Sequence, residues 1–146
     1  MAIFGAGSNW DGNEMKSNFF RDENYVIGWN YASAKDLYIA IAALKVGDII
    51  YLKANAPGSR NVRIKGIGIV TKNFMSSLID QEIALTDFIS WQSLAIKVKW
   101  VVINEFIITI PTVDGKLTNI RAATFYEETL PCVQNQVLEH FLAKLV

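Results

Sequence analysis

The sequence predicts an α+β domain in which a curved, largely antiparallel β-sheet is flanked by helices. Of its 146 residues, 51% are hydrophobic and 19% are charged, which is the balance of a globular domain with an ordinary core. Segments with the two-residue period of strands outnumber those with the helical period. No repeat, low-complexity tract or Pro/Ser-rich linker interrupts the chain, so residues 1–146 are predicted to form a single domain.

The N-terminal part of the chain is predicted to contain one strand and two helices. The strand covers residues 1–6, a polar loop follows over residues 8–13, and the first helix covers residues 14–21. Ser33 is the predicted N-cap of the second helix because apolar residues follow it at helical spacing, and Gly47 ends that helix.

Strands dominate the prediction for the rest of the chain, over residues 49–53, 62–71, 94–103, 106–110 and 118–126. The pair Asp114-Gly115 marks a hairpin turn before the last of them. Residues 73–92 fit neither period. From Pro131 onward apolar side chains recur every four residues, which predicts an amphipathic C-terminal helix.

Charge and composition exclude some functions. The chain has 14 basic and 14 acidic residues, and this zero net charge argues against a protein that coats nucleic acid by charge alone. Positive charge is concentrated in residues 44–72, which contain six Lys and Arg residues but only one acidic residue, Asp48. This segment is either a solvated strand edge or a phosphate-binding strip. No apolar run approaches the roughly 18 residues of a membrane helix, and no secretory signal is visible. We therefore expect a cytoplasmic protein with no membrane partner.

No catalytic set emerges from the sequence. The segment Gly5-Ala6-Gly7 begins like a dinucleotide-binding fingerprint, but Trp10 takes the place of its third glycine. His140 is the only histidine, and no second His or Cys lies at metal-ligand spacing, so no metal site and no cofactor are predicted. The single cysteine, Cys132, has the context of an unreactive buried thiol.

Two tryptophans stand beside turn residues and are the most informative side chains. Trp10 lies in a polar stretch with Asn9 and Gly12, and Trp29 follows Gly28 directly. A tryptophan in a polar loop offers a large flat face that can stack on a planar base or surround a methyl group. The same ring can also fold back and cap the open end of a small barrel.

Several short motifs follow one another in a characteristic order: Gly5-Ala6 with Trp10 and Gly12, Phe19-Phe20, Ile27-Gly28-Trp29, then residues 44–48, 51–53 and 64–71. In this order they resemble the PUA-like superfamily. The sequence is most similar to the EVE-type domains, including those attached to McrB-like restriction ATPases, and more distantly to the YTH readers of methylated adenine. The resemblance covers residues 3–72 and extends weakly beyond them.

This resemblance implies a PUA-like curved barrel and a pocket for a modified base between the first strand's loop, the Trp29 segment and the barrel mouth. Trp29 is similar to the tryptophan of the family's aromatic cage, with Trp10 as a second ring. Ser8 and Asn9 are similar to the polar lip of that pocket, and Asn30 offers an amide to a base edge. The predicted phosphate contacts are Lys53, Arg63 and Lys65.

The sequence therefore favours a binding module for a modified nucleobase or nucleotide, without catalytic activity of its own. One alternative is a nucleoside-directed amide hydrolase, because the related ASCH-type domains include such enzymes. That function requires Lys53 or Lys65 with a lowered pKa beside a hydroxyl or carboxylate. The other alternative is a homodimeric interaction protein with no nucleotide ligand. A homodimer is expected in any case, because the chain combines high apolar content with low charge.

Overall fold

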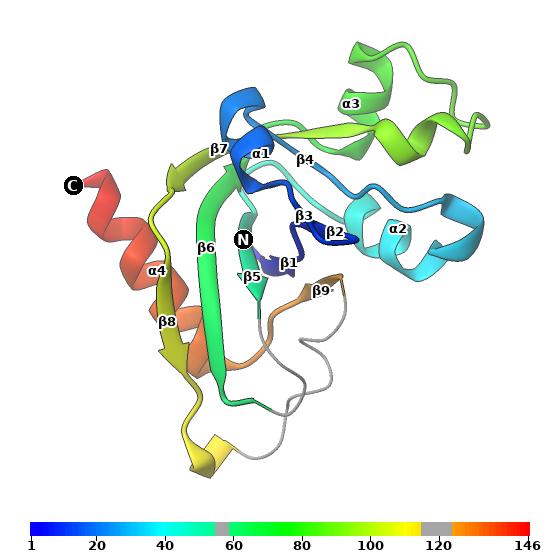
Figure 1. Ribbon diagram of the computed structural model, residues 1–146. Helices are drawn as coiled ribbons and strands as arrows, with labels where there is room; N and C mark the ends of the chain where they lie inside the picture. Colours follow the sequence, from blue (N-terminus) through cyan, green and yellow to red (C-terminus); the bar gives the residue numbers. More distant parts are fainter. Residues whose placement is uncertain (55–58, 115–123) are drawn as a thin grey trace.

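The computed structural model describes residues 1–54, 59–114 and 124–146 and shows an α+β domain (Figure 1). Within these residues the main sheet has seven strands in the order β4-β7-β6-β5-β1-β9, with β8 also paired to β6. Two further strands, β2 and β3, form a separate hairpin. The strands are β1 (Ile3–Ala6), β2 (Asn9–Trp10), β3 (Asn13–Glu14), β4 (Asn24–Val26), β5 (Ile49–Ala54), β6 (Asn61–Val70), β7 (Ala95–Val102), β8 (Phe106–Thr109) and β9 (Phe125–Glu127).

Helices flank this sheet. Contacts join α1 to β4, α2 to β9 and α3 to β7, whereas α4 packs against β6 and β7. Their bounds are α1 (Lys16–Asp22), α2 (Lys35–Ala42), α3 (Phe74–Asp80) and α4 (Pro131–Leu145), with 3₁₀ turns at Tyr31–Ser33, Ser90–Ser93 and Thr112–Asp114. None of the helices in the described ranges combines the length and the apolar character needed to cross a membrane.

The sheet is strongly curved, and β6 shows how the curvature arises. This strand is ten residues long and bends visibly along its length (Figure 1). Its pairing shifts by one residue between Ile67 and Gly68, opposite β7, and a second shift lies between Leu52 and Lys53 of β5. Such bulges bend and twist a strand. The predicted α+β class with a curved sheet and flanking helices is therefore confirmed.

One pairing in the sheet departs from the antiparallel pattern. β1 runs parallel to β5, with Ile3 opposite Ile49, because the chain between them crosses over through α1, β4 and α2. The antiparallel partner of β1 is β9, whose Phe125 lies opposite Ala6. The sheet is thus mixed at β1 and antiparallel over β5, β6, β7 and β8.

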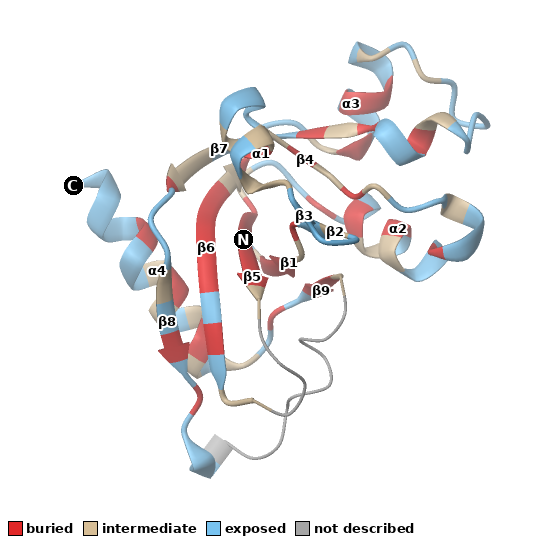
Figure 2. Ribbon diagram, in the orientation of Figure 1, coloured by how far each residue is buried: buried red, intermediate tan, exposed pale blue. Residues whose placement is uncertain are grey.

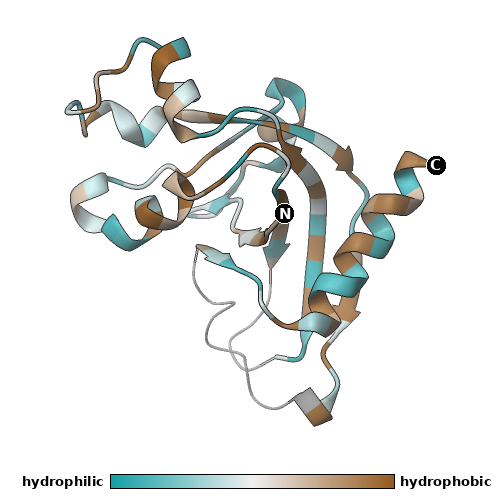
Figure 3. Ribbon diagram, turned by 180° about the vertical axis from the view of Figure 1, so that it is seen from behind, coloured by the Kyte–Doolittle hydropathy of each residue, from teal (hydrophilic) through white to brown (hydrophobic). Residues whose placement is uncertain are grey.

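Each face of the sheet covers a hydrophobic core, and Figure 2 shows the buried residues following β1, β5 and β6. One core lies toward α1, α2 and α3 and is rich in aromatic rings, including Phe19, Tyr25 and Trp91. The other lies under α4 and is mainly aliphatic, as in Val133 and Val137. Seen from behind, α4 alternates hydrophobic and hydrophilic residues, as a helix with one buried side does (Figure 3).

Several element boundaries differ from the sequence prediction. The second predicted helix, α2, begins at Lys35 with Ala34 as its N-cap, so the prediction of Ser33 as the cap is wrong. Ser33 instead ends the 3₁₀ turn that Asn30 caps by accepting a hydrogen bond from the Ala32 N–H at 2.8 Å. The prediction did not include α3, β4 or the β2–β3 hairpin. Residues 115–123 of the predicted final turn and strand lie outside the described residues.

Candidate functional site

A hollow of about 850 Å³ lies between the two tryptophans that the sequence singled out. We call it the tryptophan hollow. Three separate segments supply its walls: the β2–β3 hairpin, the end of β4 with the residues after it, and residues 89–93. Its volume falls within the range of about 300–1,000 Å³ that small-molecule sites occupy. The lining residues are Asn9, Trp10, Asp11, Asn13, Val26, Ile27, Gly28, Trp29, Ile89, Gln92 and Ser93.

The β2–β3 hairpin presents Trp10 to this hollow. Its turn residues, Asp11 and Gly12, both have positive φ, at 47° and 91°. Positive φ at both central residues is the geometry of a type I′ turn, which favours an Asp-Gly pair and matches the twist of the flanking strands. The Asn9 side-chain oxygen accepts a hydrogen bond from the Gly12 N–H at 2.8 Å and closes the turn. The turn chemistry of the sequence thus determines where Trp10 stands.

The ring of Trp10 packs directly against Gly28. A Cβ at this position would lie 2.7 Å from Cζ2 of Trp10, and the φ of Gly28 is +76°. Only glycine accepts both the close ring and the left-handed backbone without strain. Phe19 supports Trp10 from the side in an edge-to-face contact with a centroid distance of 6.1 Å. Among the described residues, packing against Gly28 and Phe19 therefore positions the ring.

Trp29 has a fixed backbone and an open side chain. Its carbonyl accepts a hydrogen bond from the Tyr38 hydroxyl at 2.6 Å, and the same hydroxyl lies 3.1 Å from the Trp91 carbonyl. Burial raises the pKa of Tyr38 to about 12, so the hydroxyl keeps its proton at neutral pH. Trp29 also lines a second hollow of about 450 Å³ beside the start of α2. Trp29 itself is 49% exposed.

A polar cluster lies beneath the hairpin and ties it to the sheet. Ser8 donates a hydrogen bond to Glu14 at 2.5 Å, Lys65 on β6 donates to the Ser8 hydroxyl at 3.1 Å, and Lys65 and Glu14 form an ion pair. Burial acts to raise the pKa of Glu14, but hydrogen bonds from Lys65 and Ser8 outweigh it, and the pKa is lowered. Lys65 is 2% exposed. It lies inside the fold and not on a surface that a phosphate could reach, contrary to its predicted role.

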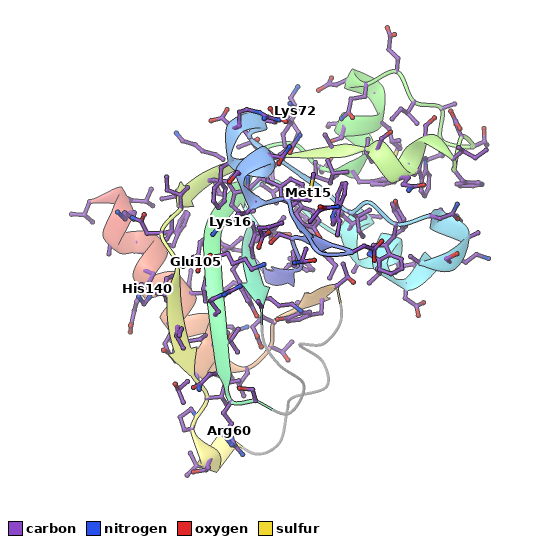
Figure 4. All side chains as sticks on the ribbon, viewed as in Figure 1. Met15, Lys16, Arg60, Lys72, Glu105 and His140 are labelled. Atoms are coloured by element: carbon purple, nitrogen blue, oxygen red, sulfur yellow. The ribbon has the colours of Figure 1, made fainter. Side chains whose placement is uncertain are left out.

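The other predicted contacts also lie away from the tryptophan hollow. Lys53 is buried with its ammonium nitrogen 5.6 Å from the centroid of the Tyr126 ring. Burial, reinforced by the positive charge of Lys65, lowers the pKa of Lys53 to about 8. Arg63 lies 3.8 Å from Glu105, which also pairs with Lys16, and Figure 4 shows Lys16 beside Glu105. None of these cations lines the tryptophan hollow.

The structure thus brings Asn9, Trp10 and Trp29 together and places Ser8 under them. Asn30 follows Trp29, but its side-chain oxygen is engaged in capping. Ile89, which is 84% exposed, also lines the hollow together with Gln92 and Ser93, and none of the three was predicted. Ile89 and Gln92 belong to residues 73–92, which show no periodic pattern, and Ser93 follows them directly, so no local signal identified them. The Asp11-Gly12 pair, in contrast, is a hairpin signal from which the β2–β3 hairpin could have been predicted.

Comparison with known proteins supports the fold. No family model matches the chain, and no curated protein is significantly similar in sequence. Among solved structures, the YTH domain of Zygosaccharomyces rouxii MRB1, in complex with N6-methyladenosine RNA, aligns with a TM-score of 0.56 and 19% identity, over 96% of this chain and 83% of that one.

Two further solved structures align over nearly the whole chain. A hypothetical protein from Leishmania major has a TM-score of 0.56 and 11% identity, over 100% of this chain and 98% of that one. Rpa0253 from Rhodopseudomonas palustris has a TM-score of 0.50 and 11% identity, over 99% and 92% of the two chains. Identities this low show a shared fold alone. The predicted distant likeness to YTH domains is confirmed at that level.

Proposed function

We propose that the tryptophan hollow binds a modified nucleobase of a nucleic acid and that the protein is a binding module of the PUA-like superfamily, close to the EVE-type domains. The observation that carries the proposal is the pair of tryptophans, brought from separate segments to one open hollow. The likeness to a YTH domain solved with N6-methyladenosine RNA supports it.

The hollow has the chemistry to hold a flat, partly apolar ring. Trp29 exposes about half of its surface, and stacking of a base on such a ring is worth about 1–3 kcal/mol. Trp10 and Ile89 add apolar walls that can receive a methyl group. Asn9 can donate from its amide NH₂, because its oxygen already accepts from Gly12, and Gln92 can donate or accept. Together these groups recognise both the face and the edge of a base.

The lining favours binding over hydrolysis. Asp11 is the only ionisable side chain among the residues described around the tryptophan hollow. Both lysines that a hydrolase of the ASCH type could use are buried: Lys65 lies 3.1 Å from the Ser8 hydroxyl under the hairpin, and Lys53 lies over the Tyr126 ring. A substrate could reach Lys65 and Ser8 only if the hairpin moved. We therefore place hydrolysis second to binding.

The test is a binding titration with labelled single-stranded RNA that carries one N6-methyladenosine, compared with the same RNA unmethylated. A pocket fitted to the methyl group discriminates by about 1–3 kcal/mol, roughly ten-fold or more in Kd. Trp29→Ala should abolish the preference, whereas Ile107→Ala, at an exposed apolar residue on β8, should leave it unchanged. The matching DNA and a 5-methylcytosine version identify the nucleic acid and the modification. If no modified strand binds better than its unmodified partner, the proposal is wrong.

A homodimer remains our prediction from composition. Exposed apolar side chains on β8 and α4, such as Ile107 and Leu142, are available for such a contact. Sedimentation over a concentration series tests it, and a monomer throughout the micromolar range would contradict it.

A further inference from the structure

A third hollow, of about 430 Å³, lies where α1 ends beside β7. We call it the lysine hollow, because Lys72, Lys97 and Lys99 line it together with Thr71 and the carboxylates Asp22 and Glu23. Figure 4 shows Lys72 at the end of the molecule opposite Arg60. Lys97 and Lys99 are exposed on β7, and being two residues apart on a strand they point to the same face.

The charges of this hollow leave an excess of cations. Asp22 is held by Arg21, and Lys72 is paired with Asp80, so these pairs cancel. Glu23 is then the remaining carboxylate for Lys97 and Lys99, although Lys97 also lies within electrostatic reach of Asp22. Neither lysine forms an ion pair within the described part of the chain. One positive charge is uncompensated. The Thr71 hydroxyl adds a neutral donor at the same place.

The two hollows share one strip of the sheet. Across the β4–β7 ladder, Val26 lies opposite Ala95 and Asn24 lies opposite Lys97. Directly opposed residues in an antiparallel pair have their side chains on the same face. Val26 lines the tryptophan hollow and Lys97 lines the lysine hollow, so the same face of this ladder borders both. The Val26–Ala95 pair and the Asn24–Lys97 pair are two residues apart along the strands, which corresponds to about 7 Å.

We propose that the lysine hollow binds a backbone phosphate of the strand whose modified base occupies the tryptophan hollow. The inference rests on the proposed function and adds the path of the strand, which runs along β4 and β7. Phosphate contacts of this kind position a strand without reading its sequence. The cations that the sequence suggested for phosphate, by contrast, do not line either hollow.

The test measures how salt weakens binding of the methylated RNA to the wild type, to Lys97→Gln/Lys99→Gln, and to the control Arg60→Gln at the far end of β6. Each lost phosphate contact lowers the slope of log K against log salt by about 0.7 for a single strand. Because the hollow is proposed to bind one phosphate, the double variant should lose a slope of roughly 0.7, whereas the control should match the wild type. Glu23→Gln should act in the opposite direction and tighten RNA binding, because it removes the opposing carboxylate.

Binding of the free nucleoside N6-methyladenosine separates the two claims. Under the proposal, all of these variants bind the nucleoside as the wild type does, because it carries no phosphate. If the wild type binds nucleoside and RNA but the double variant keeps the full salt slope, or Arg60→Gln loses as much, the phosphate inference is wrong and the base site stands. If the wild type binds neither nucleoside nor RNA, the proposed function is wrong, and this inference with it.

Discussion

The two sides of the sheet differ in what their side chains are and in how far they are closed. The core under α4 is built mainly from Ile and Val side chains and is covered by that helix. The core on the other side is built from many aromatic rings, and at its edge Trp10 and Trp29 lie only partly buried. A covered aliphatic core contributes to stability, whereas rings left open at the edge of an aromatic core are available to a ligand.

Two tryptophans on the aromatic side make this contrast sharp. Trp91 is 8% exposed and contacts the rings of Tyr31, Tyr38, Phe74 and Phe88, at centroid distances between 4.8 and 5.8 Å. Trp29 is 49% exposed, although the backbone carbonyls of Trp29 and Trp91 both accept a hydrogen bond from the Tyr38 hydroxyl. The side chain of Trp91 is packed in the core, whereas that of Trp29 is half exposed.

The largest expected effect is on stability at Trp91. Trp91→Ala should lower the free energy of unfolding by about 3–5 kcal/mol, because it empties a packed ring site. Trp29→Ala should cost less than about 1 kcal/mol, since half of its ring is already in water. Urea denaturation of both variants measures the difference. Equal losses at the two positions would remove the distinction between a packed and an open tryptophan.

The next effect concerns the ion pair that anchors the hairpin. Glu14→Gln leaves the ammonium of Lys65 buried without a countercharge and should cost about 2–3 kcal/mol. Lys65→Met should cost less, because the Glu14 side chain is 33% exposed and can be solvated when its partner is lost. Glu105→Gln, in an exposed pair, is the control and should cost under about 1 kcal/mol. A reversed order of Glu14→Gln and Lys65→Met would contradict this account of the cluster.

Gly28→Ala should cost about 2 kcal/mol, because an alanine at positive φ is strained and its Cβ would strike the Trp10 ring. Ligand binding should fall further than stability does, because Trp10 is displaced from the tryptophan hollow. Gly12→Ala is the matched control: it also has positive φ, but no atom lies within 4 Å of its added Cβ. Similar loss of binding in both variants would show that backbone strain, and not the position of Trp10, is responsible.

The smallest effect is a pH dependence from Glu14. Its pKa in the folded protein is lowered below the ordinary value of 4.5, so its charged form stabilises the fold above that value. This contribution is lost as the pH falls through the lower, folded pKa. The stability difference between wild type and Glu14→Gln should therefore be constant near neutral pH and shrink in acid. A difference that grows on acidification would have the wrong sign.

The sequence predicted the long strands, but not which lysines face outward. Residues 49–53 are buried on both faces of β5, so alternation cannot tell their direction. The register shift after Leu52 leaves Lys65 of β6 without an opposite residue in β5, and no sequence pattern shows such a bulge. Lys65 looked accessible because it is charged, yet the carboxylate that allows its burial is 51 residues away in the chain. The short elements β4 and α3 carry too few residues for a period to show.

We propose Trp10 and Trp29 as the ligand site, whereas Trp91 and Trp100 pack within the fold. NMR spectra of the indole N–H groups report on all four tryptophans of the chain at once. The four signals can be assigned with single Trp→Phe variants. On titration with N6-methyladenosine, the signals of Trp10 and Trp29 should move, while those of Trp91 and of Trp100, whose N–H donates to the Asn24 carbonyl at 3.0 Å, should stay in place. Shifts confined to Trp91 or Trp100, or no shift at any tryptophan, would contradict the account.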